Sequence, residues 1–276
     1  MNPNLVTIYQ CPFPKRRIGR WTDGGYAVAD IPNMKYDALI SGGVGNDISF
    51  EEDFIKYQDN PSMPVYIFDG TVDGLPNSEF QKQMKFTRKN IGKVDTDELT
   101  NLHSTFLPYI ANNSGREEVG FSTHAVEDPM GLRMENQPQK TSNANLFVKM
   151  DIEGGEVDWI SSLTSEHMNS IAQFVMEFHE PFSTKEIAMF TKINETHLPV
   201  HFHPNNACKT RIHNGVYFPN VFECTYLHKR FFGGEAELNR DFIPNDNVDV
   251  RNISFIEEIW MSHPPFVHFE KFVRKL

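Results

Sequence analysis

The chain has 276 residues, of which 39% are hydrophobic and 23% are charged, and its formal net charge is -11 at pH 7. These proportions are those of a globular protein with enough apolar residues for a sizeable core. The negative charge argues against non-specific binding to nucleic acid, whose backbone would repel it. No stretch approaches the roughly 18 to 20 apolar residues of a membrane-spanning helix. We therefore expect neither a membrane span nor a nucleic-acid partner.

The first ten residues combine neither a basic cap nor an apolar segment, so a secretory signal is not expected. Three cysteines, Cys11, Cys208 and Cys224, are an odd number and have no metal-ligand spacing. They are typical of free thiols in a reducing compartment, and the expected location is cytoplasmic.

Short apolar runs alternate with polar or amphipathic stretches along the chain, which favours an α/β fold. Strands are predicted at residues 37–41, 65–69, 146–151, 174–179, 199–203 and 221–227, with a weaker one at 85–87. Helices are predicted from residue 49 onward and at residues 157–163 and 184–193. Because several strands are almost continuously apolar, we expect a mostly parallel central sheet with helices on both faces.

The chain is interpreted as one domain, residues 1–276. An N-terminal extension (1–36) precedes a core (37–229), and a C-terminal tail (230–276) has no clear period. The polar segment 115–145 is interpreted as a mobile loop or lid, because strands continue on both sides of it.

A glycine-rich turn follows the first predicted core strand. That strand runs into Gly42, Gly43 and Gly45 shortly before a predicted helix. Glycines let the main chain turn tightly and approach a ligand beneath the positive end of a helix. Such a turn is a weak signal on its own, and a plain connection is about equally consistent with it.

A second feature strengthens that interpretation. Asp69 ends the strand predicted at residues 65–69, where a carboxylate can accept hydrogen bonds from both ribose hydroxyls. The alternative is that Asp69 only begins a turn with Gly70. Together, the glycines and Asp69 favour a ligand of the adenosine type at the carboxyl ends of the strands.

A third group of residues follows two further strands. Asp151, Glu153 and Glu156 come at and after the end of one, and alternation places Glu177 and His179 on one face of another. Carboxylates and an imidazole at one sheet edge can bind a divalent metal or share acid–base work. Glu156, Asp158 and Glu180 are more simply explained as helix-start or surface acids.

Three segments resemble FkbM-type S-adenosylmethionine-dependent methyltransferases: residues 41–50 (SGGVGNDISF), Phe68-Asp69 and residues 149–156 (KMDIEGGE). The resemblance covers roughly residues 17–229. It implies a Rossmann-like class I methyltransferase fold, S-adenosyl-L-methionine as the cofactor, and O-methylation of a sugar or related small-molecule acceptor. By this resemblance Gly43 and Gly45 would line the methionine moiety and Asp69 would hold the ribose. In the family an acid often precedes the glycines, but in this chain Ser41 occupies that position. Which residue would bind the amino group of the cofactor is therefore left open.

The segment 17–26 also resembles an N-terminal element of such chains. Its Asp23-Gly24-Gly25 turn would present Tyr26 and Arg17 to a ligand, or would only close the fold. The candidate cofactor-binding residues are Tyr26, Ser41, Gly42, Gly43, Gly45, Asp47, Ser49, Asp69, Gly70 and Thr71.

A later strand carries His201 and His203 on one face, with Asn205 and Asn206 at its end. Imidazoles and amide oxygens suit a metal or a sugar hydroxyl. Structural roles are equally consistent with the pattern.

Methyl transfer to a hydroxyl requires an acceptor oxygen that is held close, aligned and deprotonated. One route uses Mg²⁺ or Mn²⁺ held by Asp151, Glu177, His179 and His203. The other uses Glu153 or His179 as a general base without metal. The candidate catalytic residues are Asp151, Glu153 and His179.

Two other functions fit parts of the pattern. An NAD(P)-dependent oxidoreductase also combines a glycine-rich turn with an acid, but the third glycine in register for pyrophosphate is missing here. A non-catalytic binding module with a methyltransferase fold is the other alternative. The departure at Ser41 favours it slightly, whereas the intact glycines, Asp69 and Asp151 count against it.

Overall fold

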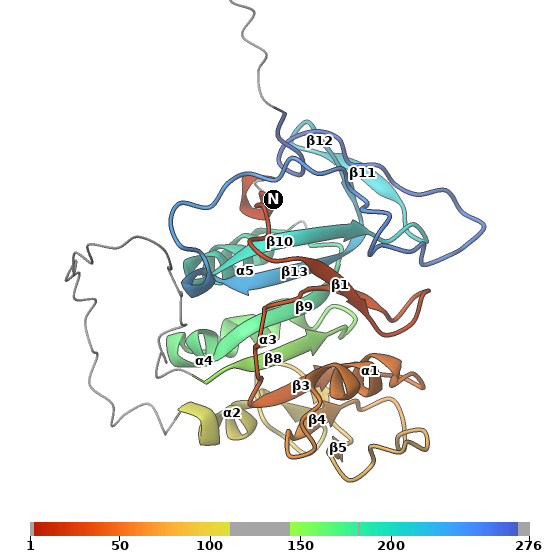
Figure 1. Cartoon of the computed structure of the whole chain (residues 1–276), viewed down its shortest axis with the longest axis vertical. Helices are drawn as coiled ribbons and strands as arrows, with labels where there is room; N and C mark the ends of the chain where they lie inside the picture. The colour runs from red at the N-terminus through yellow and green to blue at the C-terminus, as the bar shows by residue number, and fades with distance from the viewer. Residues whose placement is uncertain (1–2, 111–143, 182, 270–276) are drawn as a thin grey trace, which may run out of the picture.

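A computed structural model describes residues 3–110, 144–181 and 183–269 of the chain. At its centre lies a seven-stranded sheet with the order β10-β13-β9-β8-β3-β4-β5 (Figure 1). These strands are β3 (Ala38–Gly42), β4 (Val65–Phe68), β5 (Met84–Thr87), β8 (Leu146–Met150), β9 (Ile171–His179), β10 (His197–Pro204) and β13 (Val221–His228). Each corresponds to a strand predicted from the sequence.

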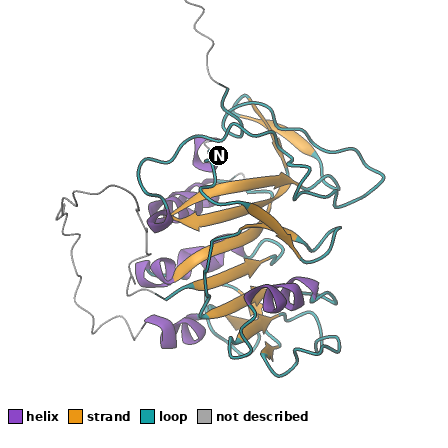
Figure 2. Cartoon of the chain, viewed as in Figure 1, coloured by secondary structure: helices purple, strands orange, loops and turns teal. Residues whose placement is uncertain are grey.

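The other elements surround this sheet (Figure 2). The helices are α1 (Ser49–Gln58), α2 (His103–Ile110), α3 (Glu156–Ser162), α4 (Ser165–Ser170) and α5 (Thr184–Thr196), with short 3₁₀ turns η1 (Pro3–Val6) and η3 (Lys229–Phe231). Three small two-stranded sheets pair β1 (Lys15–Ile18) with β2 (Tyr26–Ala29), β6 (Asn90–Ile91) with β7 (Leu99–Thr100), and β11 (Thr210–His213) with β12 (Val216–Pro219).

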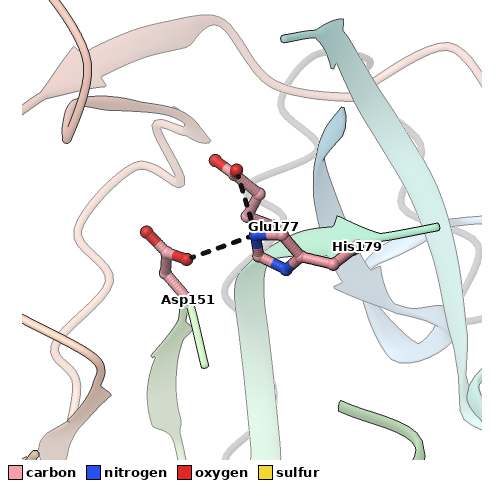
Figure 3. A group of neighbouring side chains, drawn as sticks. All are labelled: Asp151, Glu177 and His179. Atoms are coloured by element: carbon pink, nitrogen blue, oxygen red, sulfur yellow. Dashed lines mark ion pairs between the residues drawn. The ribbon is translucent and has the colours of Figure 1, made fainter. Parts of the chain in front are cut away.

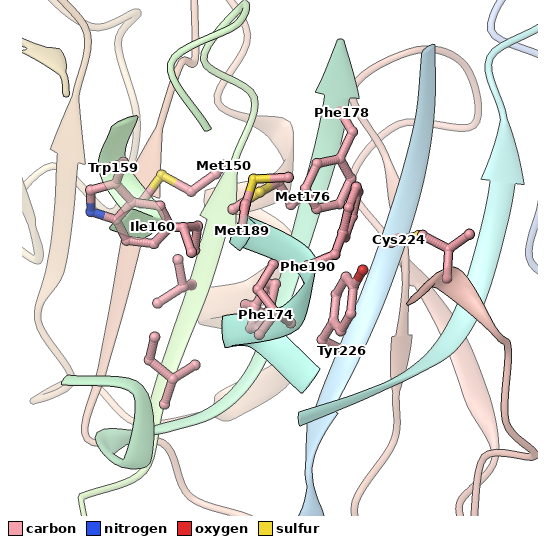
Figure 4. Close-up of a cluster of buried hydrophobic side chains, with 14 of the residues drawn as sticks. Met150, Trp159, Ile160, Phe174, Met176, Phe178, Met189, Phe190, Cys224 and Tyr226 are labelled. Carbon is pink, nitrogen blue, oxygen red and sulfur yellow. The ribbon is translucent and has the colours of Figure 1, made fainter. Parts of the chain in front are cut away.

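The two largest hydrophobic cores lie on opposite faces of the sheet. The helix-side core joins one face to α2, α3, α4 and α5. Figure 4 shows part of it, where Trp159 of α3 and Phe190 of α5 pack over β8 and β9. The hairpin-side core joins the other face to α1 and to the β1–β2 hairpin. Alternate residues of β3, β4 and β8 point into one core or the other, as expected for strands covered on both faces.

The predicted mostly parallel sheet with helices on both faces is wrong for this chain, and so is the Rossmann-like class I assignment. The sheet is mixed, because β13 is antiparallel to both β9 and β10. The helices are also unevenly distributed: among the described residues only α1 packs on the face that carries the β1–β2 hairpin.

Two connections without helices explain the difference. Residues 205–220 join β10 to β13 through the β11–β12 hairpin, so the chain turns back and pairs antiparallel. Residues 69–83, which include the turn formers Gly70, Gly74, Pro76 and Asn77, join β4 to β5 as a loop without a helix. An alternation of apolar and polar stretches does not distinguish a connecting hairpin or loop from a helix.

The segment from residue 232 to residue 269 crosses the molecule without forming a helix or a named strand. Met261, Phe266 and Val267 are nevertheless buried in the helix-side core. The tail that shows no period in sequence is therefore an integral part of the packed structure.

Among the described residues, no helix combines the length and apolar character needed to cross a membrane.

Candidate functional site

The glycine-rich turn brings the chain after β3 against the chain after β8. Gly43 has φ +70° and Gly45 has φ +52°, both in the left-handed region that favours glycine. A Cβ atom on Gly43 would lie 1.6 Å from the carbonyl oxygen of Asp151. The absence of a side chain at Gly43 is therefore what lets these two loops touch.

Asp69, directly after β4, ties this turn in place. Its Oδ2 accepts hydrogen bonds from the amides of Val44 (3.0 Å) and Gly45 (2.8 Å), and its Oδ1 accepts from the amide and hydroxyl of Thr71. Burial alone would raise the pKa of Asp69, but these hydrogen bonds outweigh it and hold the pKa below the ordinary value. The carboxylate is thus kept ionised beside the glycines.

A cleft of about 590 Å³ opens at the carboxyl ends of β3, β4 and β8. Its volume is that of a typical small-molecule site. The predicted site residues that line it are Gly43, Gly45, Asp47, Asp69, Thr71, Asp151 and Glu153. These seven predicted residues therefore lie along one cleft.

Two buried ionisable side chains that were not predicted from the sequence also line the cleft. Glu51 of α1 accepts a 2.5 Å hydrogen bond from the hydroxyl of Ser41, and Lys149 of β8 donates to the carbonyl oxygen of Gly43. The side chains of Glu51 and Lys149 are 1% and 5% exposed and both line the cleft. Glu51 lies in the first helical turn, where acids commonly only complement the helix dipole, so its position carries no distinctive signal.

Asp151, Glu177 and His179 meet beside the cleft (Figure 3), and each offers a ligand atom within 4.8 Å of the others. The Nε2 atom of His179 lies 3.4 Å from Oε1 of Glu177 and 4.0 Å from Oδ1 of Asp151. That Oδ1 atom is buried and has no hydrogen-bond partner. Two carboxylates and an imidazole are a suitable ligand set for Mg²⁺ or Mn²⁺.

Two neighbours orient two of these three side chains. Glu156 accepts a 2.9 Å hydrogen bond from Nδ1 of His179, which turns Nε2 towards Asp151 and Glu177. Tyr26 donates to Oδ2 of Asp151 at 3.2 Å. Glu156, predicted as an ordinary helix-start acid, thus holds the imidazole in the way that carboxylates commonly support metal-binding histidines.

The crowding of charge changes the pKa values of the group. Burial raises the pKa of Asp151, and burial together with neighbouring carboxylates raises that of Glu177. Burial lowers the pKa of His179, but the hydrogen bonds to Glu156 and Glu177 outweigh it and raise the pKa to about 11. His179 is therefore an imidazolium at neutral pH when no cation neutralises these acids.

The group belongs to a row of polar side chains across four neighbouring strands. Glu177 is the cross-strand partner of Glu223, and Glu223 is the partner of His203. Asp23, Glu177 and Glu223 also place ligand atoms within 4.8 Å of one another. The row lies on the face covered by the β1–β2 hairpin.

His203, predicted as a metal ligand, is not in the Asp151 group. Its Nε2 lies 3.0 Å from Glu258 and its Nδ1 lies 3.5 Å from Glu223. His201 pairs with Asp249 at 2.7 Å. Both histidines therefore hold the C-terminal segment against β10.

The two asparagines after β10 have different partners. The amide group of Asn206 donates to the carbonyl oxygens of Ile253 and Ile256, so it also anchors the C-terminal segment. Asn205 donates to Oε1 of Glu177 at 3.3 Å. Of this predicted polar patch, Asn205 alone contacts the group formed by Asp151, Glu177 and His179.

The turn at residues 19–25 closes one side of the cleft. Arg17 does not point to a ligand, because its guanidinium donates to the carbonyl oxygens of Arg20, Thr22 and Val248. Thr22, Asp23 and Gly24 line the cleft. The turn both closes the fold and borders the site.

The remaining cofactor candidates support the turn without lining the cleft. Ser49 donates to Asp47, which also pairs with Arg20 at 3.0 Å. Gly42 packs against Ile91 and Met150, and Gly70 donates to Asn90. The predicted lid, residues 115–145, lies outside the described residues except for its last two.

Asn252 lines the cleft from the C-terminal segment and donates to Asp23 and Glu223. No pattern marks it in the sequence.

Neither the protein-family models nor the curated proteins compared with the chain include a match.

Proposed function

We propose that the chain is an S-adenosylmethionine-dependent O-methyltransferase that acts on a hydroxyl of a sugar or glycan-type acceptor with the help of a divalent metal. The carrying observation is the position of Asp151. It lines the cleft beside Gly43 and also belongs to the group with Glu177 and His179. A cofactor in the cleft and an acceptor held at the metal would therefore be neighbours.

Two features of the cleft suit the cofactor, and a sequence resemblance supports the same placement. The turn at Gly43 and Gly45 leaves main chain exposed to a ligand below α1, whose positive N-terminal end faces the cleft. Asp69 is ionised at its rim, where a ribose hydroxyl can replace that of Thr71 as donor. The resemblance of these segments to FkbM-type methyltransferases supports the same placement.

Asp151, Glu177 and His179 would hold the metal, and the unpartnered Oδ1 of Asp151 supports that fit. A divalent cation bound there would lower the pKa of an acceptor hydroxyl. Polar side chains at the cleft, among them Thr22, Asp23 and Asn252, can hydrogen-bond other hydroxyls of a sugar.

We propose that Glu153 is the general base that accepts the proton of the acceptor hydroxyl. Its side chain is 82% exposed and lies 3.3 Å from His179 at the edge of the cleft. His179 itself is protonated or bound to metal and cannot accept the proton. The cofactor would supply the methyl group, which would pass from its sulfur to the acceptor oxygen with S-adenosylhomocysteine as the product, and Glu153 would take the proton of the hydroxyl.

The deciding experiment is isothermal titration of S-adenosylhomocysteine, with and without Mg²⁺ or Mn²⁺. We expect micromolar binding that Asp69→Asn weakens at least about 10-fold, because a charged hydrogen-bond acceptor is lost. Asp73→Asn is the matched control, since Asp73 is exposed in the same loop and pairs only with Arg88 among the ion pairs of the described residues. Binding of NADH in place of S-adenosylhomocysteine would favour the oxidoreductase instead.

The metal is tested separately. Asp151→Asn should abolish any effect of Mg²⁺ or Mn²⁺ on the titration while S-adenosylhomocysteine still binds. Full activity in both chelator-treated enzyme and an Asp151→Ala variant would remove the metal from the proposal.

A further inference from the structure

Glu51 is a buried carboxylate with one oxygen unused. It lies in the first turn of α1, only 1% exposed, and its Oε1 accepts the hydroxyl hydrogen of Ser41. Its Oε2 is buried without any hydrogen-bond partner, and the side chain lines the cleft. An ionised oxygen in this state is unfavourable unless a ligand supplies a donor.

The protein does not neutralise this carboxylate directly. Burial raises the pKa of Glu51, and the nearby Lys149 partly opposes that effect. The ammonium group of Lys149, however, donates its hydrogen bond to the carbonyl oxygen of Gly43. The salt bridges found among the described residues do not include Glu51 with Lys149.

The place of Glu51 matters because it adjoins Ser41. Ser41 is the last residue before the glycines, where the resembling methyltransferases often have an acid. The Ser41 hydroxyl donates a hydrogen bond to Oε1 of Glu51. Strand β3 therefore ends in an uncharged residue, and α1 supplies a carboxylate beside it.

We infer that Glu51 binds the α-ammonium group of the cofactor's methionine portion, with Ser41 as its positioning residue. The inference rests on the proposed function, because it takes S-adenosylmethionine as the occupant of the cleft. An ammonium donor satisfies Oε2 with a charge-assisted hydrogen bond, which is stronger than a neutral one.

Binding of three ligands distinguishes the contribution of the ammonium group from that of the rest of the cofactor. They are S-adenosylhomocysteine, its analogue with hydrogen in place of the α-amino group, and 5′-methylthioadenosine, which lacks the amino-acid portion. On the wild-type protein, we expect the first to bind about 10- to 100-fold more tightly than the des-amino analogue.

The variant Glu51→Gln should lose that advantage. Its affinity for S-adenosylhomocysteine should fall about 10- to 100-fold, with little change for the other two ligands. Ser41→Ala should show the same selectivity with a smaller loss. Glu52→Gln is the matched control, because Glu52 shares the helical turn but does not line the cleft.

Each failure has a separate meaning. Equal binding of S-adenosylhomocysteine and its des-amino analogue by the wild-type protein would overturn the role of Glu51 and leave the cofactor assignment standing. An equal loss for all three ligands in Glu51→Gln would show a purely structural role. If the wild-type protein binds none of the three, the proposed function itself fails. The wild-type comparison can overturn the inference even if Glu51→Gln does not fold.

Discussion

Gly43 is the residue at which a single methyl group would disturb the site most. Its positive φ strains any other residue, and its Cβ position is filled by the carbonyl oxygen of Asp151. We expect Gly43→Ala to lower the free energy of unfolding by about 3 kcal/mol. Gly45→Ala should cost about 1 kcal/mol, because Gly45 has a positive φ but open space around it. Urea unfolding of both variants checks this, and similar losses would contradict it.

Four residues predictable from sequence share one property: each lies near or just beyond the carboxyl end of a strand. Gly43, Asp69, Asp151 and Glu177 come together because the carboxyl ends of neighbouring parallel strands meet at one edge. Glu51 and Asn252 reach the same cleft from a helix and from an aperiodic segment. Their contribution depends on tertiary packing, which no local pattern reports.

At the scale of elements, the segment at residues 249–258 closes the site although it has no regular structure. Asn206 is 4% exposed, and its side chain makes hydrogen bonds to the main chain at Ile253 and Ile256. Asn206→Ala would leave those main-chain groups unpaired, and we expect it to cost about 2 kcal/mol. It should also speed proteolysis within this segment.

Asn247→Ala, in an exposed part of the same tail, should have neither effect. Unfolding in urea and limited proteolysis measure both quantities. Unchanged protease resistance in Asn206→Ala would show that other contacts suffice to hold the segment.

Apolar runs predicted the central strands well, and β8 and β13 differ from their predicted ranges by a single residue at one end. What apolar runs cannot report is the direction of a strand. The direction of β13 depends on the β11–β12 connection, whose Asn-Gly turn makes a hairpin where a helix would have kept the strands parallel. The helices α2 and α4 were not predicted, because α2 contains Pro108 and α4 has a single apolar residue among its six.

At the scale of the whole molecule, buried histidines make stability depend on pH. Burial lowers the pKa of His167 to about 4, that of His228 to about 3, and that of His197 well below its ordinary value. His167 and His228 each use Nδ1 to accept a main-chain N–H, which requires the neutral imidazole.

Because unfolding exposes these histidines, the unfolded chain binds more protons below its histidine pKa of about 6.5. Their stabilisation is complete above that pH and is lost as the pH falls towards the folded values. We expect His228→Asn to reduce the slope of unfolding free energy against pH by at most about 1.4 kcal/mol per pH unit. Urea unfolding between pH 5 and 6.5 measures it, and identical slopes for the variant and the wild-type protein would refute the assignment.

The position of β13 inside the sheet also has a consequence for biosynthesis. Strand β13 is the last strand of the sheet to leave the ribosome, yet it lies in the interior of the sheet between β10 and β9. Until residues 221–228 emerge, the nascent chain presents the open edge of β9, in which eight of nine residues end up buried. An open apolar edge is a template for wrong pairing. Chains that stop before residue 221 should therefore depend on chaperones or aggregate, whatever the state of the cleft.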